Sequence, residues 1–201
     1  MKILLTGFDP FGGEQVNPAL EAVKRVAAPD FELVKLTVPT VFEEAAQVVL
    51  DAIESHRPDA VVCVGQAGGR SQITPERVAI NIIDARIPDN KGNQPKDCPV
   101  VKEGPAAYFS TLPIKDMVSA MEAAGIPAAV SNTAGTFVCN CLMYRVLHAL
   151  AVSGRQIPAG FIHVPYIPEQ TGNREEAVPS LPLDQIIRGL EAALYALPAG
   201  Q

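Results

Sequence analysis

A cysteine at the predicted start of a helix is the strongest candidate for chemistry in this sequence. A β-branched run ends near Val130, a turn of small residues follows, and the apolar spacing predicts a helix over 138–151. Cys139 therefore lies in the first helical turn, where unpaired N–H groups and the helix dipole favour the thiolate, its nucleophilic form. The same N–H groups can stabilise an oxyanion. This position predicts a nucleophile for acyl transfer.

The other three cysteines do not extend this site. A helix turns by about 100° per residue, so Cys141 points away from Cys139 by about 200°. Cys63 lies in a hydrophobic run and is typical of a small buried side chain, whereas Cys98 is expected to be an exposed thiol in a polar loop. Cys139 and Cys141 lack the spacing of zinc ligands and no second close pair follows, so we expect no metal and no cofactor.

One of the three histidines lies where α/β proteins place their ligands. His163 is near the end of the hydrophobic run Phe-Ile-His-Val-Pro-Tyr, at the predicted carboxyl end of a strand. This position favours a general acid/base role over a core role. His56 ends a predicted surface helix, where a cation suits the dipole. His148, on the helix predicted over 138–151, is expected to be structural and half-buried.

A Cys–His pair needs a third group that orients the imidazole. Glu76 lies at the start of an apolar segment, but it could equally pair with Arg77 or be a solvated loop charge. Spacing alone does not select Glu76 over Asp9, Asp84 or Asp89. The residues by themselves leave this position open.

A Gly-rich turn over 6–14 follows the first apolar run. A phosphate-binding loop needs Lys and then Ser or Thr after its second Gly, and this chain has Gly13 and Glu14 there. No G-x-G-x-x-G pattern occurs, so a nucleotide-binding role is disfavoured. Phe8 and Phe11 lie in the same turn. They either plug the core or line an apolar pocket at the end of the strand, and the turn itself favours neither.

Short β-branched runs alternate with longer stretches of helical spacing, which predicts strands alternating with helices. Asn17 and Pro18 form an N-cap and first helical residue, and Thr40 with Glu43 forms a capping box. The fold class is therefore α/β, a single-domain three-layer sandwich with a largely parallel twisted sheet and helices on both faces. The predicted strands are 2–6, 31–38, 59–64, 128–130 and 160–164, and the predicted helices are 17–26, 40–55, 114–124, 138–151 and 183–197.

The whole chain, residues 1–201, is expected to be one domain, because no linker, repeat or low-complexity tract divides it. Two long irregular stretches, 87–105 and 165–182, are rich in Pro, Gly and Asn. Loops of this length in a compact domain are often functional, so we expect both to serve the site.

Composition excludes several classes of function. The chain has 16 Lys and Arg and 22 Asp and Glu, which gives a net charge of -6. Aromatic residues make up 5% of it, and there is no Trp. A nucleic-acid partner is not expected, since such binders need a basic face. No apolar run approaches the roughly twenty residues of a membrane span, and the N-terminal apolar stretch is too short for a signal peptide. We expect a cytoplasmic protein with no membrane partner and with reduced thiols.

Four blocks of this sequence together resemble the pyroglutamyl peptidase I (pyrrolidone-carboxylate peptidase) family of cysteine peptidases. The resemblance covers nearly the whole chain, with the blocks in matching order and spacing. The blocks are Thr-Gly-Phe-Asp-Pro-Phe-Gly-Gly (6–13), Gly-Gln-Ala-Gly-Gly-Arg (65–70) with Thr-Pro-Glu-Arg (74–77), Ala-Gly-Thr-Phe-Val-Cys-Asn (134–140) and Phe-Ile-His-Val-Pro-Tyr (161–166).

The resemblance implies a thiol exopeptidase, an omega peptidase that removes N-terminal pyroglutamate from peptides through a thioester acyl-enzyme. It implies a catalytic triad of Cys139, His163 and Glu76, and so assigns the position that spacing left open. Family members are commonly homotetramers, so a homo-oligomer is expected, with the second loop around Tyr166 and Ile167 as a natural contact.

Pyroglutamate is a flat, uncharged ring, and the family likeness assigns its two faces to Phe8 and Phe11. Gln66 can both donate to and accept from the lactam. Weaker pocket candidates are Asn17 and Thr40, which could simply cap helices, and Arg86, for which a surface ion pair is about equally plausible. A pocket without a fixed charge would reject an ionised N-terminus, because burying an unpaired ammonium is costly.

Two other functions remain as alternatives. A Cys-dependent amidase of different acyl specificity would keep the triad and accept substrates without the lactam ring. A nonenzymatic small-ligand binding protein would use the cleft at Phe8 and Phe11 and would not need Cys139.

Overall fold

Four hydrophobic runs form the parallel part of a five-stranded sheet in the order β2-β1-β3-β7-β4. The structure, a computed structural model, describes residues 1–172 and 177–198. Strands β2, β1, β3 and β7 run parallel and β4 is antiparallel to β7, so the carboxyl ends of the four parallel strands share one edge. The strands of this sheet are β1 (Lys2–Phe8), β2 (Glu32–Val38), β3 (Ala60–Gln66), β4 (Thr74–Pro75) and β7 (Ala159–Val164).

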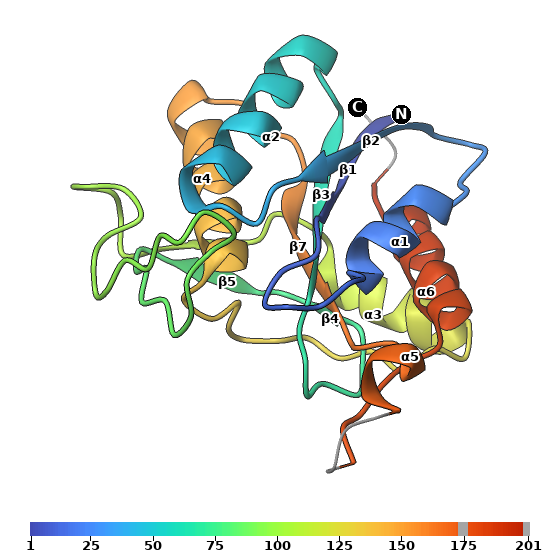
Figure 1. The fold of residues 1–201 in the computed structure, drawn as a ribbon. Helices are drawn as coiled ribbons and strands as arrows, with labels where there is room; N and C mark the ends of the chain where they lie inside the picture. The colour runs from blue at the N-terminus through green and yellow to red at the C-terminus, as the bar shows by residue number, and fades with distance from the viewer. Residues whose placement is uncertain (173–176, 199–201) are drawn as a thin grey trace.

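Helices cover both faces of this sheet (Figure 1). Helices α2 and α4 pack on one face and α1, α3 and α6 on the other, each over its own hydrophobic cluster. The predicted α/β fold class and three-layer arrangement are confirmed. None of the described helices has both the length and the apolar character that a membrane crossing needs. The helices are α1 (Pro18–Arg25), α2 (Phe42–His56), α3 (Ile114–Ala123), α4 (Val138–Ser153), α5 (Pro168–Thr171) and α6 (Leu183–Tyr195).

The two predicted helix caps have different outcomes. Asn17 caps α1 as predicted, since its Oδ1 accepts from the Ala19 N–H at 3.1 Å. The predicted capping box at Thr40 is wrong, because α2 begins at Phe42 and no side chain next to it in sequence caps it. Instead Asp89 reaches across from a distant loop and accepts from the Phe42 N–H at 3.2 Å.

Several short elements were not predicted from the sequence. Strand β4 is one, α5 is another, and a two-stranded antiparallel sheet of β5 (Val78–Ile80) and β6 (Ala107–Phe109) lies apart from the main sheet. The strand predicted over 128–130 is wrong: that segment makes only an isolated bridge at Ala128, to Ile73.

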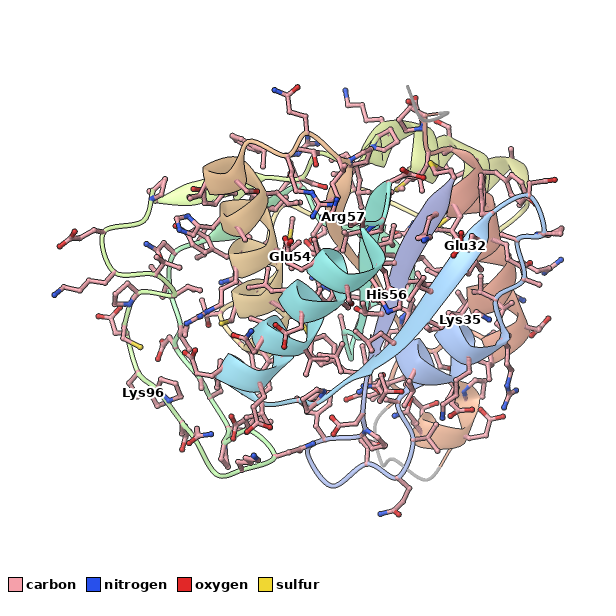
Figure 2. All side chains as sticks on the ribbon, turned by 90° about the horizontal axis from the view of Figure 1, so that it is seen from above. Glu32, Lys35, Glu54, His56, Arg57 and Lys96 are labelled. Atoms are coloured by element: carbon pink, nitrogen blue, oxygen red, sulfur yellow. The ribbon has the colours of Figure 1, made fainter. Side chains whose placement is uncertain are left out.

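The exposed edge of the main sheet is β2, which carries charged side chains. Glu32 and Lys35 lie on this strand at the sheet edge, and His56 and Arg57 lie at the end of α2 (Figure 2). Lys35 also donates to the carbonyl of Val26 at 2.6 Å. Charges of this kind keep an edge strand from pairing with another chain.

Of the two predicted working loops, the first is fixed to the body of the protein. Asp89 is buried and accepts from the backbone N–H groups of Lys91 and Asn93 as well as Phe42. Asn90 adds a bond from its Nδ2 to the Pro10 carbonyl at 2.9 Å. In the second loop, residues 173–176 lie outside the described part of the chain.

Candidate active site

The antiparallel strand β4 brings a carboxylate to the imidazole of His163. Thr74 pairs with His163, and the Glu76 N–H donates to the Phe161 carbonyl at 2.8 Å. This register places Glu76 Oε1 at 2.7 Å from His163 Nδ1. Glu76 is fully buried and His163 is 4% exposed. Of the four carboxylates that spacing left open, Glu76 is therefore the one that meets the imidazole.

The charges of this pair are set by burial and by neighbours. Burial opposes ionisation of Glu76, but hydrogen bonds from His163 and Arg70, together with the charge of His163, hold its pKa below the usual 4.5. Burial also lowers the pKa of His163 below 6.5; Glu76 offsets this in part, while Arg70 lowers it further. At neutral pH the geometry thus holds an ionised Glu76 against a neutral His163.

The start of α4 is anchored so that Cys139 faces the carboxyl ends of β3 and β7. Asn140 is buried, and its side chain accepts from the Ile80 N–H and donates to the carbonyls of Ile80 and Ile82. Gly65 on β3 pairs with His163, and a Cβ added there would lie 3.0 Å from the Cys139 sulfur. Because Gly65 has no side chain, the Cys139 thiol has room beside β7, the strand that carries His163.

Cys139 lies in the first turn of α4, as predicted, but its environment disfavours the thiolate. Burial raises the pKa of the Cys139 thiol to about 12; the charge of Glu76 adds to this shift and the charge of Arg70 opposes it. Burial thus acts against the thiolate that the helix start favours.

Cys139 and His163 both line a cleft of about 490 Å³ at the carboxyl edge of the sheet. Phe11 lines it from the β1–α1 loop and Phe137 from the turn before α4, with ring centres 6.2 Å apart. Phe8 is placed differently from the prediction. It is 2% exposed, packs 6.2 Å from Phe161, and is absent from the described residues that line the cleft.

Gln66 lines the same cleft and is held by a glutamine from the second loop. Gln170 Nε2 donates to Gln66 Oε1 at 3.0 Å and also to Glu14 and to the Val16 carbonyl. Because the Gln66 oxygen accepts from Gln170, its amide nitrogen is the group that can donate to a ligand carbonyl.

The three weaker pocket candidates lie in different places. Asn17 and Thr40 are buried and both donate to the Asp9 carbonyl, so they hold the β1–α1 loop and are absent from the described cleft lining. Arg86 lines the cleft as an exposed residue beside Ile87. The structure thus brings Arg86, but not Asn17 or Thr40, to the cleft wall.

Sequence reasoning assigned no role to two residues of this site. Phe137 directly precedes α4, and its position one residue before a first-turn cysteine was an available signal. Arg70 contacts Glu76 from the β3–β4 loop, with 2.6 Å between Nη1 and Oε1. No periodicity or spacing in the sequence distinguishes Arg70 from other surface arginines.

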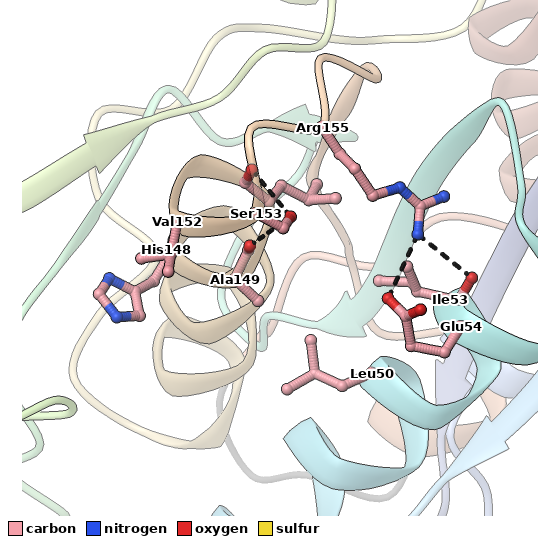
Figure 3. Close-up of a pocket in the computed structure, with 9 residues that line it drawn as sticks. Leu50, Ile53, Glu54, His148, Ala149, Val152, Ser153 and Arg155 are labelled. Carbon is pink, nitrogen blue, oxygen red and sulfur yellow. Dashed lines mark hydrogen bonds and ion pairs between the residues drawn. The ribbon is translucent and has the colours of Figure 1, made fainter.

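A second hollow, of about 370 Å³, lies between the ends of α2 and α4 but holds no comparable group of residues (Figure 3). Arg155 there pairs with Glu54 at 3.4 Å, and His148 points away from this pair. The ring of His148 bonds the Tyr108 hydroxyl at 2.9 Å, as expected of a structural histidine. Over residues 1–172 and 177–198, no three His, Cys, Asp or Glu side chains gather as a metal site would require.

Known proteins resemble this chain over almost its full length. The sequence model of a family described as Pyroglutamyl peptidase matches residues 1–199. A pyrrolidone-carboxylate peptidase of Streptococcus pyogenes is 57% identical over 199 residues, which are 98% of this chain and 92% of that protein. The crystal structure of Bacillus amyloliquefaciens pyroglutamyl peptidase I has a TM-score of 0.93 at 54% identity, with 98% and 96% of the two chains covered. A mutant pyrrolidone carboxyl peptidase from Pyrococcus furiosus gives 0.94 at 42% identity, with 98% of each chain covered.

Proposed function

Because the chain belongs to the pyroglutamyl peptidase family, we propose that Cys139, His163 and Glu76 are the triad with which it cleaves its substrate. The protein is a cysteine-type peptidase that removes N-terminal pyroglutamate from peptides. The observation that supports the triad is the cleft itself, which gathers a first-turn thiol and an imidazole bonded to a buried carboxylate.

The imidazole tautomer follows from the contact with Glu76. The carboxylate accepts from Nδ1–H, so Nε2 carries the lone pair and acts as the base. His163 Nε2 takes the thiol proton as the Cys139 sulfur attacks the exocyclic carbonyl carbon of pyroglutamate. The N–H groups that begin α4 stabilise the oxyanion.

The two halves of the reaction then use the same proton carrier. His163 gives its proton to the leaving amine, the C–N bond breaks, and a thioester remains on Cys139. His163 next takes a proton from water, whose oxygen attacks the thioester carbonyl. The sulfur leaves, regains the proton from the imidazole, and free pyroglutamate departs. Glu76 stabilises the imidazolium in both halves.

Recognition of the ring is assigned to aromatic and amide side chains. Phe11 packs against one face of the lactam ring, whereas Phe8 is buried against Phe161 and acts from the core. The Gln66 amide nitrogen donates to the lactam carbonyl. Arg86 acts at the rim, while Asn17 and Thr40 act through the β1–α1 loop that carries Phe11.

The finer properties carried over from the family likeness are proposals as well. We propose one catalytic domain over 1–201, working without a cofactor in the cytoplasm as a homo-oligomer, with a tetramer as the expected state. The subunit contact expected at the second loop stays a prediction; there Ile167 is buried in its own core and Tyr166 is half-buried. Phe109 and Val152, 70% and 74% exposed, are the most exposed large apolar side chains of the described residues, and such a contact would cover them. Light scattering, which measures the mass of the assembly in solution, tests the proposed tetramer.

The test is release of a chromogenic amine from pyroglutamyl amide beside prolyl amide under reducing conditions. The two compounds differ only by the lactam carbonyl, so cleavage of the first alone supports the assigned pocket. Equal cleavage of both compounds would indicate a Cys-dependent amidase. Binding without cleavage by folded, reduced protein would indicate a binding protein.

A further inference from the structure

Arg70 makes three hydrogen bonds inside the candidate active site, although the proposed triad gives it no role. Its Nη1 donates to Glu76 Oε1 at 2.6 Å and also to the Thr74 hydroxyl. Its Nη2 donates to the Thr133 carbonyl at 3.1 Å. The Arg70 side chain is 27% exposed, whereas that of Glu76 is fully buried. One guanidinium therefore enters the site from the β3–β4 loop and binds three groups on two segments, the β4 region and the turn before α4.

The same carboxylate oxygen serves Arg70 and His163. Glu76 Oε1 accepts from Arg70 Nη1 at 2.6 Å and from His163 Nδ1 at 2.7 Å. A carboxylate held by one partner alone could rotate about its last side-chain bond. Two donors on one oxygen restrict that rotation, so the imidazole meets an acceptor that a second residue holds in place.

The second amino group of Arg70 connects this pair to the nucleophile. Thr133 belongs to the turn over 131–137, which leads directly into α4 and Cys139. Its carbonyl accepts from Arg70 and from the Ser131 hydroxyl. A shift of this turn moves the start of α4, so Arg70 couples the position of the thiol to that of the Glu76–His163 pair.

We propose that Arg70 is a positioning residue of this active site, which fixes the Glu76 carboxylate against His163 and ties both to the turn that carries Cys139. This inference rests on the proposed function, since it assigns Arg70 to the proposed triad. The planar fork of an arginine suits this role, because it can reach two acceptors at once, whereas a lysine offers one point charge.

The charge of Arg70 adds an effect that a purely structural residue would lack. It opposes protonation of His163 and favours loss of the proton from Cys139. Among residues 1–172 and 177–198, the other charged or titratable groups that face the imidazole or line its cleft are Glu76, Cys139, Glu14, Asp84, Arg86 and Tyr166. Among them Arg86 is the other cation, and it is an exposed residue. Removal of Arg70 should therefore raise the pKa of His163.

The test compares Arg70→Gln, Arg70→Lys and a matched control, Arg77→Gln. Arg77 donates from Nε to Asn132 Oδ1 at 2.7 Å, so it contacts the same turn without contacting Glu76. Steady-state kcat and KM for pyroglutamyl amide are measured across pH, with thermal melting as the check of folding. A second readout needs no substrate: the rate at which iodoacetamide alkylates Cys139, followed by peptide mass spectrometry.

We expect Arg70→Gln to lower kcat by about 10²-fold, the cost of misplacing reacting groups by about 1 Å, with KM little changed. The acid limb of the pH profile should move to higher pH, and alkylation of Cys139 should slow. Arg70→Lys should keep the acid limb near that of the wild type, because it keeps the charge, but not the full kcat. Arg77→Gln should match the wild type in both readouts.

Other results would overturn the assignment. A folded Arg70→Gln variant with wild-type kcat, acid limb and alkylation rate would do so, as would equal losses in Arg70→Gln and Arg77→Gln. If Arg70→Gln does not fold, a wild-type kcat in folded Arg70→Lys would overturn the assignment instead. Lack of cleavage by the wild type itself would contradict the proposed function. The alkylation rates then still decide the role of Arg70.

Discussion

Glu76→Gln removes one charge from the site and leaves its hydrogen bonds in place. Arg70 is a pure donor, so it will bind the oxygen of a glutamine at position 76 rather than its NH2 group. The same oxygen then still accepts from His163 Nδ1, which keeps the tautomer that leaves Nε2 as the base. The substitution therefore tests the charge of Glu76 rather than its position.

The size of the effect follows from the geometry of the pair. Nδ1 and Oε1 lie 2.7 Å apart, and both charges are spread over their groups. Taking charge centres about 4 Å apart and an effective dielectric constant of about 20, the carboxylate stabilises an imidazolium by about 4 kcal/mol. The proposed transition state develops that imidazolium, so loss of the Glu76 charge should lower kcat/KM by about 10³-fold, at about 1.4 kcal/mol per tenfold.

The assay is the pH dependence of kcat/KM for pyroglutamyl amide. Glu76 raises the pKa of His163, so Glu76→Gln should move the acid limb to lower pH, the opposite direction to Arg70→Gln. Glu122→Gln, the same exchange at an exposed position on α3, is the control and should leave the profile unchanged. An acid limb that stays in place or moves up, or a loss below about tenfold, would refute the assigned electrostatics.

Three further predictions concern the thiols, the first loop and acid stability. Cys139→Ser should abolish turnover and leave the melting temperature unchanged. Cys141 is buried near the Phe42 carbonyl, so Cys141→Ser should keep activity but lose about 1–3 kcal/mol of unfolding free energy in urea. Loss of turnover in Cys141→Ser but not in Cys139→Ser would contradict Cys139 as the nucleophile. Asp89→Ala removes the cap of α2 and should cost about 1–2 kcal/mol in the same assay, and no change would show that the cap is unimportant. Because the pKa of His163 is lowered in the native state, the unfolded chain binds a proton there that the native protein does not. Stability should therefore fall as pH drops below 6.5, and His163→Gln should flatten that slope.

The sequence predicted those elements whose own residues carry a strong pattern. Strands β1, β3 and β7 are mainly apolar runs, β2 alternates apolar with polar side chains, and the five long helices show clear helical spacing, so each was found within a few residues of its bounds. Strand β4 has only two residues, one of them proline, and exists because Thr74 pairs with His163. Short elements of this kind depend on partners distant in sequence and leave no periodic signal.

The same distinction explains which site residues could be found. Cys139 and His163 are marked by their own elements, a helix start and a strand end. Glu76 has no local mark, since it meets His163 only through the antiparallel β4–β7 register, 87 residues away in the chain. Arg70 depends in turn on Glu76 and on Thr133, so its role emerges only when three segments have come together.

Cys139 shows where reasoning from a single element fails even when it places the residue correctly. The first turn of a helix favours a thiolate by up to about 2 kcal/mol, because unpaired N–H groups and the dipole stabilise negative charge. Burial acts against this and is stronger, so the pKa of the thiol rises to about 12. Gly65 of β3 lies beside the Cys139 sulfur and the charge of Glu76 adds to the shift, and neither residue belongs to the helix. In the proposed triad the helix start therefore marks the nucleophile, whereas the packing around the thiol opposes loss of its proton, and its activation is assigned to His163.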